Sequence, residues 1–158
     1  MRTPDPIAAR VPMRVPDSPV PLKGFRVWGV TRTPEGPRLQ SPTAGFLFAP
    51  LPVWAPNERF EARCVDLRNR CAAGDVPARG HRCGIYAVST PGRAFDWADE
   101  IEHRTYVIGE VWSWGTVAEH AAGWRSRYAY PASFLEARTR GHLDDALTDE
   151  LRTTYLAG

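Results

Sequence analysis

Hydrophobic and polar residues alternate along several short stretches of the chain, which is the pattern of strands in a half-buried sheet. The clearest stretch is GFRVWGVTR, residues 24–32, and the turn sequence TPEGP follows it. Leu39 and Gln40 come next, so we expect them to begin a return strand and complete a hairpin.

Four further stretches predict strands. ERFEARC (58–64) and CGIYAVS (83–89) are short, while TYVIGEVWSWGTVAEH (105–120) is long and rich in residues typical of strands. AGWRSRYAY (122–130) reads as the antiparallel partner of the long stretch, because a short turn at 121–123 joins the two.

Two segments predict helices. Pro91 suits the first position of a helix that we expect to run to about Glu102, with Phe95, Ala98 and Ile101 on its buried face. Near the chain end, apolar residues recur every four positions and predict an amphipathic helix. These residues, which follow Gly141, are Leu143, Leu147, Leu151 and Tyr155.

Prolines interrupt the pattern in two places. Residues 1–22 contain six prolines and predict a flexible or extended arm. The segment 41–58 is apolar but contains four prolines, so we expect an irregular loop that lays Phe46, Phe48 and Trp54 on the core.

These elements predict an α+β fold, with a mainly antiparallel sheet of about five to seven strands that is curved or partly closed. One helix is inserted between strands, a second follows them, and a zinc-clipped loop joins two strands. We divide the chain into the arm 1–22, a β-rich domain 23–137 with a metal loop at 64–83, and the C-terminal amphipathic helix 138–158.

Charge and composition narrow the function. The net charge of +2, from 20 basic and 18 acidic residues, does not indicate a strongly basic nucleic-acid binder. The chain has no apolar run of membrane-spanning length and no signal-peptide core near its first residue, so we expect a cytoplasmic protein without membrane contact. Three cysteines in such a protein favour metal binding or free thiols over disulfides.

Four candidate metal ligands occur within 20 residues, in the pattern C-x6-C-x9-H-x-C: Cys64, Cys71, His81 and Cys83. Four donors of this kind match the tetrahedral coordination of structural zinc. A polar loop between two strands has few apolar residues to hold it, and a zinc ion would fix it. The alternative is one or two small buried cysteines with His81 facing solvent.

The CGIYA sequence at 83–87 and a later G-x-V-x-x-W-G-x-V-x-x-H-x-x-G-W-R stretch at 109–125 resemble a group of small uncharacterised proteins, mainly from actinobacteria. The similarity covers roughly residues 60–131. It implies a common fold unit and a metal loop, without an activity. The group is expected to have cysteine where this chain has His81, so the ligand set here becomes three cysteines and one histidine.

The letters GIY at 84–86 and YVIG at 106–109 also suggest a GIY-YIG nuclease. In that family the two segments are adjacent strands joined by a short turn. Here a whole expected helix separates them, Val107 interrupts the second motif, and Glu110 comes too early to bind the catalytic magnesium. The nuclease is therefore the least favoured of the functions considered.

A second candidate site is a ligand pocket near the turn at 121–123. Aromatic walls and a few polar groups are typical of such pockets, and Arg125 would clamp a carboxylate or phosphate. The candidate residues are Trp114, His120, Trp124 and Arg125. The alternative is an ordinary hairpin whose aromatic residues pack on the core. Because Arg alternates with aromatic residues in WRSRYAY, single-stranded nucleic acid is another possible ligand.

The pattern as a whole favours a non-enzymatic binding or adaptor module with a structural zinc, whose arm and C-terminal helix contact a protein partner. A nucleic-acid-associated regulator is the second interpretation and a nuclease the third.

Overall fold

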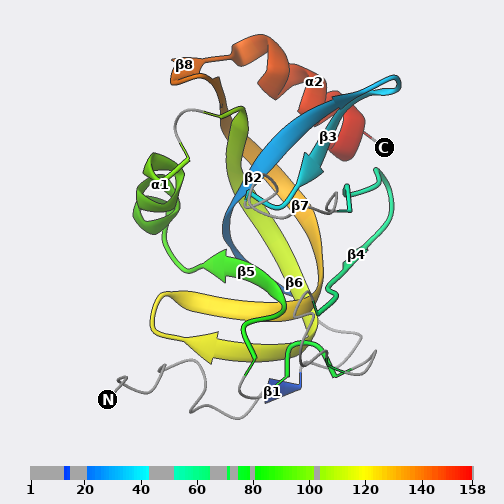
Figure 1. Cartoon of the computed structure of the whole chain (residues 1–158), viewed down its shortest axis with the longest axis vertical. Coiled ribbons are helices and arrows are strands. Elements are labelled where there is room, and N and C mark those ends of the chain that lie inside the picture. The colour runs from blue at the N-terminus through cyan, green and yellow to red at the C-terminus, as the bar shows by residue number, and fades with distance from the viewer. Residues whose placement is uncertain are drawn as a thin grey trace.

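A computed structural model of the chain describes residues 13–14, 21–42, 52–64, 71, 75–78, 81–101 and 104–157. Over these residues the chain forms an antiparallel sheet of eight strands with two helices (Figure 1). The sheet is curved and does not close into a barrel. The expected α+β class is therefore confirmed. No helix in this part of the chain is long and apolar enough to cross a membrane.

The strands are β1 (Met13–Arg14), β2 (Leu22–Thr33), β3 (Gly36–Gln40), β4 (Phe60–Glu61), β5 (Ile85–Val88), β6 (Tyr106–His120), β7 (Gly123–Thr139) and β8 (His142–Leu143). Along the sheet their order is β1-β6-β2-β5-β7-β4, with β3 on β2, β8 on β7 and a further pairing of β6 with β7. The expected hairpin of β2 with β3 is present. Regular strand pairing covers only β4 within the expected strand 58–64 and only β5 within the expected strand 83–89. Both strands are therefore shorter than the sequence predicted.

The β6–β7 hairpin forms the centre of the sheet (Figure 1). Its pairing is interrupted by three register shifts, the last between Trp114 and Val117. Irregularities of this kind bend a sheet and increase its twist. Gly115 lies in that last shift with φ +82°, a conformation that favours glycine. The bent sheet brings β5, on the outer edge of β7, to β2 at the single pair Phe25–Val88.

The first helix, α1 (Pro91–Asp99), begins where Thr90 caps it by accepting a hydrogen bond from a backbone N–H of the first turn. Its buried residues are Ala94 and Ala98, whose small side chains let the helix lie close to the sheet. Phe95 was expected on the buried face but is 41% exposed. One position along a helix rotates a side chain by about 100°, which carries Phe95 away from the face that Ala94 and Ala98 share.

The second helix, α2 (Asp145–Leu156), packs on β7 and β3. Leu147, Leu151 and Tyr155 are buried, as the four-residue spacing predicted. Leu143 does not belong to the helix: it lies in β8 and is 55% exposed. The reason is the cap, because the Asp144 side chain accepts a hydrogen bond from the Leu147 N–H and fixes the start of the helix after Leu143.

The proline-interrupted segment contributes Trp54 to the core. This side chain is 2% exposed, stacks on Phe60 at a ring distance of 4.5 Å and meets Trp28 edge-on at 5.6 Å. Phe46 and Phe48, also expected on the core, lie outside the described residues, as does most of the arm 1–22.

A substitution at Gly109 tests whether the backbones of β6 and β7 must lie close together at this point. A Cβ at this position would lie 2.0 Å from the Ser133 carbonyl oxygen. We expect Gly109→Ala to lower the free energy of unfolding by more than about 2 kcal/mol, because backbone atoms would have to move. The measurement is urea denaturation.

Gly92→Ala is the matched control, since a Cβ there meets nothing within 4 Å and the residue lies in α1. It should raise the free energy of unfolding by roughly 0.5–1 kcal/mol through helix propensity. Equal stability of the two variants would contradict the expected strain.

Candidate metal centre

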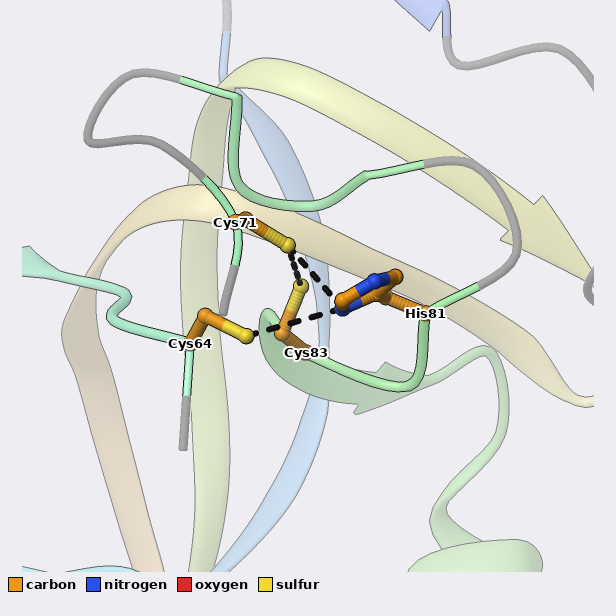
Figure 2. Close-up of side chains that lie close together, drawn as sticks. All are labelled: Cys64, Cys71, His81 and Cys83. Atoms are coloured by element: carbon orange, nitrogen blue, oxygen red, sulfur yellow. Dashed lines mark hydrogen bonds between the residues drawn. The ribbon is translucent and has the colours of Figure 1, made fainter. Parts of the chain in front are cut away.

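The structure brings together the four side chains that the sequence predicted as metal ligands. Their donor atoms all lie within 4.8 Å of one another and point toward a common centre (Figure 2). Cys64 follows β4, and Cys83 precedes β5. Cys71 and His81 come from the segment between them. The group could hold a metal ion. Which metal binds depends on the chemical preference of sulfur and imidazole donors.

The spacing of the donors suits tetrahedral coordination. The His81 Nδ1 atom lies 3.0 Å from the Cys71 sulfur and 3.5 Å from the Cys64 sulfur, and the sulfurs of Cys71 and Cys83 are 3.6 Å apart. A tetrahedral zinc with bonds of about 2.3 Å to sulfur and 2.0 Å to nitrogen separates its ligands by roughly 3.5–3.8 Å. Small shifts therefore suffice to bind zinc, with Nδ1 as the histidine donor.

The thiols interact unfavourably once they ionise. Burial raises the pKa of Cys71 to about 12, and hydrogen bonds and charge interactions with Cys64 and Cys83 add to the effect. A cation among the sulfurs would offset the repulsion between the thiolates and favour their ionisation. The thiolate is also the form of cysteine that binds a metal. Cys64 and Cys83 are buried, whereas Cys71 and His81 are half-buried.

A glycine shapes the chain directly after the last ligand. Gly84 has φ +116°, which other residues rarely adopt. A Cβ at Gly84 would lie 3.0 Å from the Cβ of Arg125 and 3.1 Å from the Cβ of Pro77. Gly84 therefore lets the chain turn from Cys83 into β5 while β7 lies close against it.

Arg125 of β7 holds the backbone of two ligands. It is 1% exposed, and its Nη1 donates hydrogen bonds to the carbonyl oxygens of His81 and of Cys83, the latter at 2.9 Å. These bonds orient the H-x-C segment from outside the donor group. Sequence analysis missed this role because the pairing of β5 with β7, which aligns Tyr86 with Arg125, leaves no local signal.

The residues of the predicted ligand pocket lie in different surroundings. Trp114 lines a cavity of about 670 Å³. The His120 ring lies 6.0 Å from the Tyr86 ring. The Trp124 ring lies so close to Gly24 that it occupies the space a Cβ would take there. Arg125 is buried and donates to the carbonyl oxygens of His81 and Cys83. Binding of a small molecule by the four predicted residues stays a prediction.

The large cavity lies between β6, β7, the end of α2 and the segment before β4. Trp112 and Trp114 both line it, as expected from their alternation along β6. Its other lining residues are Pro21, Asn57, Glu58, Arg59, Tyr130, Tyr155, Leu156 and Ala157.

Among the alternating Arg and aromatic residues of β7, Tyr128 does not offer an open stacking surface. Tyr128 is 8% exposed, and the guanidinium groups of Arg59 and Arg127 lie 4.1 and 5.0 Å from its ring centre. Single-stranded nucleic acids bind by stacking their bases on accessible aromatic rings. The nucleic-acid interpretation thus finds no support at Tyr128.

The GIY and YVIG segments are not neighbouring strands in the described residues. β5 pairs with β2 and β7, whereas β6 pairs with β1, β2 and β7. The Tyr86 hydroxyl donates to the Arg82 carbonyl oxygen, and Glu110 forms an ion pair with Lys23 at 2.8 Å. This arrangement differs from the adjacent strands that a GIY-YIG nuclease requires.

Comparison with protein-family models, curated proteins and solved structures finds no match to this chain. Functional inference therefore starts from the geometry of its own residues.

Arg125 provides a test of the ligand geometry. We expect Arg125→Met to weaken zinc binding by about ten- to a hundredfold, because residues that orient metal ligands have effects of this size. Arg138→Met is the control, since Arg138 also lies in β7 and also donates to a loop carbonyl, that of Gly141. Competition with a chromophoric chelator measures both, and equal affinities would contradict the assigned role.

The raised pKa of Cys71 predicts a pH dependence. Below that pKa the metal-free thiol is protonated, and zinc must displace the proton. The affinity for zinc should therefore rise with pH, by at least about tenfold between roughly pH 7 and pH 8. Calorimetry in buffers of different ionisation enthalpy counts the released protons. An affinity that does not change with pH would contradict thiolate ligation.

Proposed function

We propose that this chain is a non-enzymatic binding or adaptor module whose 64–83 loop is held by a structural zinc ion. The observation that carries the proposal is the convergence of three cysteine sulfurs and one histidine nitrogen on one centre. Soft sulfur donors with imidazole favour zinc among the common divalent metals. Four protein ligands also fill the tetrahedral coordination, which leaves no open position for a catalytic water.

The position of the metal explains what it would stabilise. β4 and β5 are two and four residues long, and both pair with β7. Cys64 follows the first of these strands and Cys83 precedes the second. Short edge strands are marginal by themselves, so a metal bound to both flanking segments would fasten them to β7.

The large aromatic cavity supports a binding role. Pro21, near the end of the arm, and the last residues of α2 both contribute to its lining, together with Trp112 and Trp114. A concave surface with aromatic walls and a few polar groups is typical of a recognition site. The buried face of α2 packs on the sheet, so we assign partner contact to the end of this helix and to its exposed face.

Metal content tests the proposal. Purified protein should contain about one zinc per chain, and a strong chelator should lower its melting temperature, because structural zinc contributes free energy of folding. Mass spectrometry under native conditions and calorimetry measure the two effects.

Cys83→Ser should lose the metal, since it removes a soft donor. His81→Cys is the matched control: it exchanges one zinc donor for another and should keep one zinc per chain. A chain that binds no metal, or a melting temperature unaffected by Cys83→Ser and by the chelator, would overturn the structural zinc.

A further inference from the structure

Arg26 of β2 is a buried arginine without an acidic partner among the described residues. It is 5% exposed, and its Nη1 donates a hydrogen bond of 2.5 Å to the carbonyl oxygen of Tyr86. The Nε of Arg26 has no hydrogen-bond partner in the part of the chain that the structure describes. A guanidinium has five N–H donors, and the one on Nε is unused in the described part of the chain.

Aromatic rings surround this charge. The guanidinium carbon lies 5.4 Å from the ring centre of Trp54, 5.6 Å from that of Trp97 and 5.9 Å from that of Trp28. Cation–π contacts offset part of the desolvation. Burial nevertheless lowers the pKa of Arg26 to about 9, and no anion in the described residues opposes that shift. Buried charges in proteins are usually paired, so a buried guanidinium without an acidic partner in the described residues points to a bound anion.

Arg26 lines a cavity of about 250 Å³. Two further arginines, Arg63 and Arg82, line it as well and are exposed, and none of the described residues that line it is acidic. The cavity is therefore electropositive. Its apolar wall consists of Pro42, Pro52, Trp54, Phe60, Ile85 and Trp97.

We propose that this cavity binds a small organic anion, a carboxylate or phosphate carried on a single aromatic ring or an apolar group of similar size. The guanidinium of Arg26 matches the two oxygens of such an anion. The tryptophan walls suit an apolar body rather than a bare ion. A cavity of about 150 Å³ accommodates benzene, so the volume here is sufficient for a one-ring carboxylate.

Anion binding at Arg26 does not require the proposed zinc, although Cys83 and Gly84 also line the cavity. Zinc content is measured in every sample, so that a failure of the metal hypothesis and a failure of anion binding give different results.

Calorimetric titration of the full chain with benzoate tests the proposal. Benzoate should bind saturably at one site, and benzyl alcohol, which lacks the charge, should bind at least about tenfold more weakly. Inorganic phosphate, which lacks the ring, should also bind at least about tenfold more weakly. Binding of phosphate as tight as that of benzoate would replace the organic anion with an inorganic one and overturn the proposal.

Arg26→Met should weaken benzoate binding by at least about tenfold. Met is long and apolar and removes an unpaired buried charge, so the fold is expected to tolerate it. Arg32→Met is the control, because Arg32 is exposed and paired with Glu150. Unchanged affinity for benzoate in Arg26→Met, or no binding to the unaltered chain, would overturn the proposal.

Arg63→Ala is a second variant that does not depend on the stability of the core, since Arg63 is exposed. It should weaken benzoate binding by roughly two- to fivefold and reduce the dependence of affinity on salt. If Arg26→Met does not fold, an equal affinity of Arg63→Ala and the unaltered chain, at low salt, would count against the site.

Discussion

The pairing of β6 with β7 is the interaction on which the rest of the structure depends. These strands have 15 and 17 residues. Every other strand except β3 pairs directly with one of them, and β5 pairs with β2 as well as with β7. α2 packs on β7. The register shifts that bend the hairpin also bring β5 close to β2, so the shape of this one pairing decides where the metal loop and the smaller cavity lie.

Two buried arginines hold β5 from opposite neighbours. Arg26 of β2 donates to the carbonyl oxygen of Tyr86, and Arg125 of β7 donates to those of Cys83 and His81. Charge-assisted hydrogen bonds to backbone carbonyls are stronger than neutral ones, and they offset part of the desolvation of each guanidinium. The start of this four-residue strand and the segment before it are thereby held from both sides, which links the Cys/His cluster to the electropositive cavity.

A short sequence motif forms a functional site only if the strands that carry it are neighbours in the sheet. Tyr86 and Tyr106 stand in strands that do not pair with each other in the described part of the chain, so the GIY and YVIG letters do not form one site. The cysteines and His81, by contrast, come from separate segments and converge. A ligand set of this kind is recognisable from residue type alone, because few other roles require three sulfurs and an imidazole within one polar loop.

The sequence by itself determined the features that depend on neighbouring residues: the alternation of β2 and β6, the helix start at Pro91, the four-residue spacing of Leu147 and Leu151, and the identity of the four candidate donors. Only the tertiary structure decided that β5 pairs with β7, that Arg125 donates to the backbone of His81 and Cys83 and that Arg26 is buried beside a cavity. The reason is physical. Local patterns follow from hydrogen bonding and burial within one element, whereas the choice of strand partners depends on the packing free energy of segments far apart in the chain.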